Sequence, residues 1–170
     1  MSPFRHAARA CALVVALSPA IAAAHMVVEP PEAPAGDYVK AAFRVTHGCQ
    51  GTPTVSLTIR IPEGVLGAKP QVKPGWAIEI KTRPVNPPVD LGHGFLLRET
   101  ATEITWRGGS LPNAYFDEFA LSMRTPDKPG TTLLFPTIQT CEKGSYEWVE
   151  TPKPGEHVHA PAPAMKLRAR

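Results

Sequence analysis

Proline constrains the fold of this chain more than any other residue type. The 170 residues include 20 prolines, which recur in stretches such as "EPPEAP" at 29–34, "VNPPVD" at 85–90 and "PKPGEH" at 152–157. Each proline removes a backbone donor and clashes with the preceding turn inside a helix. The segments between the prolines are therefore expected to form strands and turns, with few helices.

Short segments of alternating apolar and polar residues lie between these prolines. In the segment 54–61, Val55, Leu57 and Ile59 share one face, as expected for a half-buried strand. The other predicted strands cover 38–45, 77–83, 103–107, 115–124 and 131–138, with weaker candidates at Val149 and in the final "MKLRA". This pattern predicts an all-β fold, an antiparallel β-sandwich of the immunoglobulin or cupredoxin-like kind.

Turn residues separate the predicted strands. The pairs Pro74–Gly75, Gly108–Gly109 and Pro129–Gly130 are typical of turns. The segment 82–93 has little periodicity and several prolines, so we interpret it as a mobile hairpin connection. The segment 152–170 is proline-rich, and its "MKLRA" stretch is a candidate edge strand.

The first 24 residues have the three parts of a secretory signal peptide. Arg5 and Arg9 supply positive charge, an apolar run follows at 10–21, and Ala22 and Ala24 are the small residues before a cleavage site. Cleavage there would make His25 the first residue of the mature chain. We expect an exported, periplasmic protein without a membrane anchor in its mature form.

Removal of the signal peptide leaves the chain almost neutral. It takes away two arginines and no acids, so 16 basic residues stand against 15 acidic ones. No basic stripe is present, so the sequence favours neither a nucleic acid nor an anionic membrane as partner.

Two cysteines remain in the mature chain, because Cys11 leaves with the signal peptide. Cys49 and Cys141 form an even pair in an oxidising compartment, which favours a disulfide. The alternative is a pair of thiolate metal ligands, although their spacing resembles no close C-x-x-C site.

His25 is the main candidate metal ligand. As a first residue it offers both its α-amine and its imidazole Nδ1 to one metal ion in a compact chelate. Nitrogen ligands in a tetragonal arrangement favour Cu(II). The alternative is an exposed terminal histidine without a role.

Other side chains could complete such a site. His47, in "THGC", lies two residues from Cys49, so a disulfide would fix its position; it is a second candidate ligand. Glu147 could add a carboxylate and Trp148 could shield the metal from water, unless Trp148 simply packs in the core. His93, His157 and His159 are interpreted as loop residues.

The sequence contains no recognisable catalytic constellation. Asp117 and Glu118 are adjacent on a predicted strand and so point to opposite faces, which argues against a catalytic carboxylate pair. No nucleophile elbow, phosphate-binding glycine loop or H-E-x-x-H motif is present. We therefore predict a protein that is not an enzyme.

Several motifs, taken in order, resemble those of the YcnI-like family of exported bacterial copper-binding proteins. They are "AHMVVEPPEAPAGDYVKAAFRVTHGCQG", "IRIPEGVLGAKPQVKPGW" and "ITWRGGSLPNAYFDEFALSMRTPDKPGTTLLFPTIQTCEKGSYEWVE", and together they span about residues 25–151. The resemblance implies a β-sandwich that binds Cu(II) through its first histidine, His25 here. It also implies a tryptophan beside the site, matched by Trp148, and a glutamate contribution, for which Glu147 and Glu29 are the candidates.

These inferences together predict a periplasmic Cu(II)-binding protein that transports, buffers or delivers copper. Other periplasmic copper-handling proteins are the partners that the resemblance implies. Two alternatives remain open: a copper-dependent oxygenase with a histidine brace that includes His47, and a metal-free adhesion or interaction domain.

Overall fold

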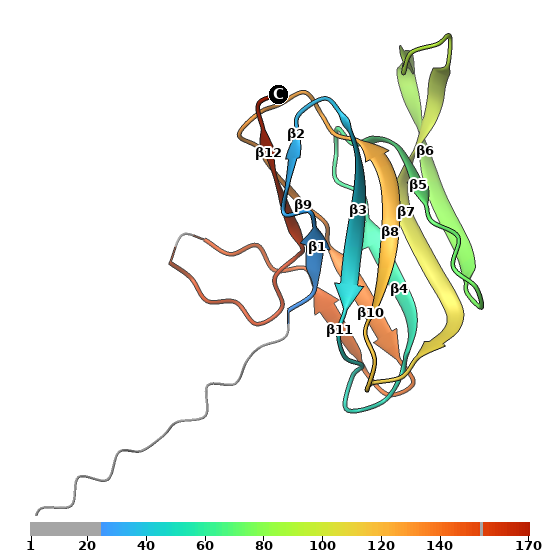
Figure 1. Cartoon of the computed structure of the whole chain (residues 1–170), viewed down its shortest axis with the longest axis vertical. Coiled ribbons are helices and arrows are strands. Elements are labelled where there is room, and N and C mark those ends of the chain that lie inside the picture. Colours follow the sequence, from blue (N-terminus) through green and yellow to red (C-terminus); the bar gives the residue numbers. More distant parts are fainter. Residues whose placement is uncertain (1–24, 154) are drawn as a thin grey trace, which may run out of the picture.

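The computed structural model describes residues 25–153 and 155–170, so the predicted signal peptide lies outside the described residues. Every regular element in the described part of the chain is a β-strand, which confirms the predicted all-β class. Two main sheets and one small sheet form a sandwich (Figure 1). Among the described residues, no helix is long and apolar enough to cross a membrane.

The two main sheets are antiparallel. The four-stranded sheet has the order β1-β3-β8-β5, formed by β1 (Val27–Glu29), β3 (Tyr38–Val45), β8 (Asp117–Arg124) and β5 (Leu66–Pro70). The five-stranded sheet has the order β11-β10-β4-β7-β6, formed by β11 (Ser145–Trp148), β10 (Thr137–Cys141), β4 (Thr54–Arg60), β7 (Leu96–Leu111) and β6 (Ala77–Asp90).

The hydrophobic core lies between these two sheets. Leu57 and Ile59 on β4 are fully buried, as the alternation of this segment predicts. Trp106 on β7 meets Phe119 on β8 edge-to-face, with ring centroids 5.5 Å apart. Burial of each such side chain stabilises the fold by about 1.5–3 kcal/mol, so these contacts hold the two sheets together.

The end of the chain is integrated into the fold. Strand β12 (Ala164–Arg168) lies between β2 (Glu32–Pro34) and β9 (Thr132–Leu134) in a three-stranded sheet. The prediction of an edge strand at "MKLRA" is therefore wrong, because β12 pairs on both sides. Met165 and Leu167 are fully buried and anchor this strand in the core.

The predicted single strand at 131–138 is divided in two. It comprises β9 and the start of β10, which belong to different sheets. The break falls at Phe135–Pro136, where proline has no N–H to donate to a ladder. Phe135 is fully buried and its N–H bonds to the carbonyl of Pro163, so the chain crosses between sheets at this point.

The segment 82–93 is mostly strand, not a loop. Strand β6 continues to Asp90 and pairs with β7 in a long hairpin. Its prolines are tolerated because β6 is the edge strand of its sheet, where one row of backbone N–H groups needs no partner. The register shifts between Pro84 and Val89, around the remaining prolines.

The pair Gly108–Gly109 lies inside β7, so the turn predicted there is also wrong. Gly108 has a φ of 81°, which favours glycine. A Cβ at Gly109 would lie 2.2 Å from the Trp76 ring. These glycines therefore bend the strand and admit the indole.

The three strands β1, β2 and β5 were not predicted, because three to five residues are too short to show alternation.

Candidate metal site

The start of the described chain lies beside the end of β3. Strands β1 and β3 are antiparallel, with Val27 opposite Arg44. His25 precedes β1 by two residues, and His47 follows the end of β3 by two residues. The topology therefore brings the two candidate histidines to the same end of the sandwich.

Both histidines contact Trp148 on β11. The Trp148 ring centroid lies 6.4 Å from that of His25 and 6.3 Å from that of His47, each pair edge-to-face. The ring centroid of Tyr146 lies 5.2 Å from that of Trp148 and 5.6 Å from that of His47. We call these four residues the aromatic cluster. Trp148 is its buried centre, with 4% of its surface exposed.

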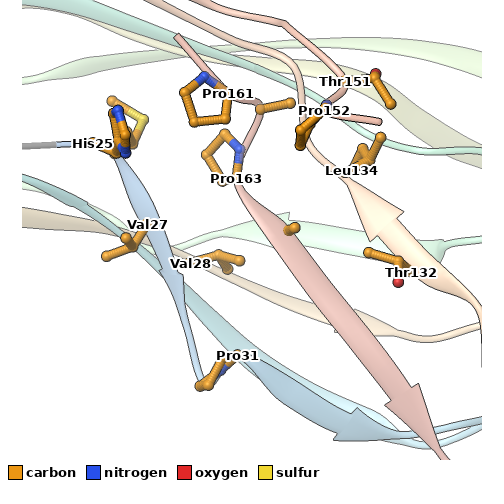
Figure 2. A pocket seen from close by; sticks show the side chains of 13 residues that line it. His25, Val27, Val28, Pro31, Thr132, Leu134, Thr151, Pro152, Pro161 and Pro163 are labelled. Carbon is orange, nitrogen blue, oxygen red and sulfur yellow. The ribbon is translucent and has the colours of Figure 1, made fainter. Parts of the chain in front are cut away.

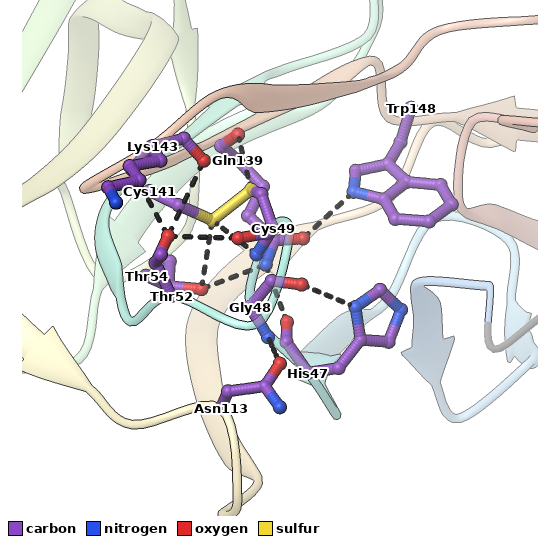
Figure 3. Close-up of a disulfide and its surroundings, with 10 residues drawn as sticks. All are labelled: His47, Gly48, Cys49, Thr52, Thr54, Asn113, Gln139, Cys141, Lys143 and Trp148. Atoms are coloured by element: carbon purple, nitrogen blue, oxygen red, sulfur yellow. Dashed lines mark hydrogen bonds between the residues drawn. A yellow bond between two sulfur atoms is a disulfide. The ribbon is translucent and has the colours of Figure 1, made fainter.

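The turn "THGC" positions the His47 ring. The N–H of Gly48 donates to Asn113 Oδ1 at 3.0 Å, and Cys49 forms the disulfide with Cys141 (Figure 3). The Nδ1 of His47 donates to the carbonyl oxygen of Gly48 at 2.8 Å. Because a carbonyl only accepts, a neutral His47 ring carries its lone pair on Nε2.

The predicted disulfide is confirmed. Cys49 and Cys141 are bonded, with Cα atoms 5.7 Å apart, and both are buried. The bond joins the turn after β3 to the end of β10 and so links the two main sheets. The alternative of two thiolate metal ligands is thereby set aside.

Gln139 on β10 connects the histidine turn to the tryptophan. Its Nε2 donates to the carbonyl of His47 at 2.7 Å and to Thr54 Oγ1 at 2.8 Å, and its Oε1 accepts from Trp148 Nε1 at 3.1 Å (Figure 3). Only 1% of Gln139 is exposed. A buried polar side chain with its donors and acceptor engaged fixes the geometry around it.

Replacing Gln139 with methionine is expected to release Trp148 while keeping the side-chain volume. The free energy of unfolding should fall by about 1–3 kcal/mol, because buried polar groups lose their partners. In NMR spectra the indole N–H signal of Trp148 should shift and exchange faster with solvent. The indole of Trp106 is the internal control, because it donates to the carbonyl of Gln71 instead. An unchanged Trp148 signal would contradict this role of Gln139.

His25 fits the requirements of a metal ligand. Its Nε2 is buried and has no hydrogen-bond partner among the described residues. A buried nitrogen without a partner costs free energy. A chelate with the α-amine would use the other ring nitrogen, Nδ1. The chemistry of the nearby donors is imidazole nitrogen, which suits Cu(II) and Zn(II).

The two glutamates lie elsewhere. The carboxylate of Glu29 forms a salt bridge with Arg44 at 2.8 Å. Glu147 follows Tyr146 and precedes Trp148 on β11, so its side chain points to the opposite face of the strand. Over residues 25–153 and 155–170, no group of three or more His, Cys, Asp or Glu side chains comes together to hold a metal ion. The structure therefore does not bring either predicted carboxylate to the aromatic cluster.

An apolar cavity of about 550 Å³ opens beside His25 (Figure 2). Strands β1 and β9 and the segment between β11 and β12 form its walls, which include Val28, Leu134, Pro161 and Pro163. Among the described residues that line it, none is Asp, Glu, Lys or Arg.

The other described histidines, His93, His157 and His159, lie in loops, as the sequence predicts. His93 lies at the tip of the β6–β7 hairpin, and His157 and His159 are exposed between β11 and β12. Sequence reasoning missed Gln139 and Tyr146. The spacing of Tyr146 and Trp148 on one strand face is a signal for the tyrosine, but no motif marks Gln139.

The fold and the site define a class: a disulfide-bonded, immunoglobulin-like β-sandwich with two histidines around a buried tryptophan at one end. The chain belongs to the family described as Domain of unknown function (DUF1775), whose model matches residues 25–167. This match extends beyond residue 151, where the sequence analysis placed the end of the domain, and includes most of β12.

One solved structure, an uncharacterized protein from Nocardia farcinica, supports this fold. That protein has an immunoglobulin-like fold and is 25% identical, with a TM-score of 0.64 over 85% of this chain and 98% of that chain. A "putative membrane anchored protein" from Corynebacterium diphtheriae is 9% identical, with a TM-score of 0.45 over 86% of this chain and 35% of that chain. No curated protein matches this sequence.

Proposed function

We propose that this protein binds Cu(II) in the periplasm and transports, buffers or delivers it, without acting as an enzyme. The observation that carries the proposal is the convergence of His25 and His47 on Trp148. The resemblance to the YcnI-like copper-binding family implies that His25 is a ligand and that the metal is Cu(II).

In this proposal each residue of the cluster has a distinct part. The mature chain begins at His25, whose α-amine and Nδ1 chelate the ion. His47 adds a third nitrogen through Nε2, since its Nδ1 donates to a carbonyl. Trp148 covers one side, and Gln139 holds Trp148 and the His47 turn in place. Neither Glu29 nor Glu147 is included, because of their positions.

A Cu(II) titration of the mature chain tests this function. We expect one ion per chain, a nitrogen-rich electron paramagnetic resonance signal, and quenching of tryptophan fluorescence. The variant Trp148→Phe should lose most of the copper-dependent quenching, because Trp106 lies in the core and Trp76 packs against Phe119. His47→Ala should weaken binding and simplify the nitrogen signal. The variant His157→Asn/His159→Asn is the matched control and should bind as the wild type does. Absence of binding would leave the metal-free interaction domain as the better hypothesis.

The two histidines around one tryptophan also favour a second candidate, a copper-dependent oxygenase. This alternative requires that the copper-loaded chain oxidise a polysaccharide when ascorbate or hydrogen peroxide is supplied. Tight binding without turnover would support a carrier.

A further inference from the structure

A second cavity lies at the other end of the sandwich. Strand β3 begins at Tyr38, beside this cavity, and ends at Val45, close to His47. At about 3.3 Å per residue, this strand separates the two regions by roughly 25 Å. The second cavity is therefore independent of the aromatic cluster and of the proposed copper function.

The tip of the β6–β7 hairpin forms one wall of this cavity. The hairpin extends beyond the body of the sandwich (Figure 1) and ends in "LGHGF" at 91–95. Leu91 Cδ1 approaches within 3.4 Å of the position that a Cβ would take at Gly67 on β5. His93 is one of two described non-glycine residues with positive φ, at 52°. Such a conformation is uncommon outside glycine and often marks a functional site.

The cavity has a volume of about 460 Å³, within the range of small-molecule sites. Its apolar part is built by the hairpin, from Leu91, Phe95 and Leu97. Leu97 is 8% exposed, whereas Phe95 is 55% exposed. An aliphatic or aromatic ligand body would cover the Phe95 ring and so remove an exposed apolar surface from water.

The polar part of the cavity carries donors and positive charge. Tyr38 and Ser122 contribute hydroxyl groups, and Lys69 and His93 contribute basic side chains. The ammonium group of Lys69 lies 5.9 Å from the centre of the Phe95 ring and forms no salt bridge within the described part of the chain. It stands at the boundary between the polar and apolar parts.

No carboxylate lines the cavity among the described residues. The two carboxylates nearest in sequence to the lining residues accept hydrogen bonds from backbone N–H groups. Asp37 accepts from Tyr38 at 2.8 Å, and Asp90 accepts from Gly92 at 2.7 Å. The site therefore favours an anionic group over a cationic one.

We propose that this cavity binds an amphipathic carboxylate, with its anionic head on Lys69 and the hydroxyls, and its apolar body on Leu91, Phe95 and Leu97. A charge-assisted bond to Lys69 and burial of the apolar body act together, so each half of the ligand contributes to affinity.

Isothermal titration of the metal-free mature chain with dodecanoate, below its micelle concentration, tests the proposal. We expect saturable binding of one molecule, and binding of the dodecyltrimethylammonium cation at least about tenfold weaker, because Lys69 repels it. Butyrate, which has the same head and a short tail, should also bind weakly. Equal affinity for the anionic and cationic amphiphiles, or no binding of dodecanoate, would overturn the proposal.

Three variants locate the site. Lys69→Met should weaken dodecanoate binding about tenfold or more, whereas Lys69→Arg should retain most of it. Lys128→Met, at an exposed lysine outside the cavity, is the matched control and should bind normally. Dodecanoate should shift amide NMR signals of residues 91–97; shifts at Val28 and Leu134 instead would place it in the cavity beside His25 and overturn the assignment.

Discussion

Adding one alanine ahead of His25 is expected to lower the affinity of the mature chain for Cu(II) by about 100-fold or more, because one arm of a chelate is lost. In the proposed site of the mature chain, the α-amine and the imidazole of one residue bind the same ion. The extra residue converts that amine into an amide nitrogen, which binds Cu(II) only after it loses its proton, so the amine–imidazole chelate within one residue is lost. The new terminal amine belongs to alanine, which has no imidazole.

The fold provides a control for this experiment. The added alanine precedes Met26 and Val28, which are buried, and strand β1, which begins at Val27. It therefore adds nothing to the core. The free energy of unfolding of the metal-free protein should therefore not change. A chain with one alanine added after Arg170 is the matched control and should bind copper normally. Equal copper affinity with and without the alanine ahead of His25 would falsify the proposed chelate. It would indicate that copper binds at His47 or at the exposed histidines.

The sandwich could be predicted because its longer strands alternate. The bounds of β3 were predicted to the residue, and those of β4 to within one residue, since each has one face in the core. Strand β6 was predicted only in part because proline, which normally ends a strand, is tolerated at a sheet edge. The place of β12 between two partners depends on contacts with β2 and β9, which no local pattern encodes.

The candidate site was predictable where chemistry is carried by single residues. His25, His47 and Trp148 stand out by residue type, and the structure brings all three together. The glutamates do not stand out by residue type in this way, because carboxylates are common on exposed strand faces. Gln139 could not be predicted, because its role depends on which groups surround it at 2.7–3.1 Å.

Replacing both Cys49 and Cys141 with alanine is expected to lower the free energy of unfolding by about 4–5 kcal/mol, the chain-entropy value for a loop of this length. The two cysteines are 92 residues apart in sequence, so the bond restricts a long stretch of the unfolded chain. A typical domain has a total stability of about 5–15 kcal/mol, so much of the margin would be lost. Urea denaturation with and without reductant measures this loss.

The same substitution should also weaken copper binding, because the disulfide adjoins both halves of the site. Cys49 lies two residues after His47, and Cys141 lies two residues after Gln139, so the bond holds the histidine turn against the strand that fixes Trp148. Reductant should bring the wild-type protein to the stability of the variant and leave the variant unchanged. The variant Thr52→Val, which removes a hydroxyl of the same turn but keeps the disulfide, separates a local effect on the turn from loss of the bond. If the wild-type unfolding midpoint were the same in oxidising and reducing buffer, the bond would contribute nothing to the fold, and any loss of copper affinity in the double variant would have to come from the turn alone.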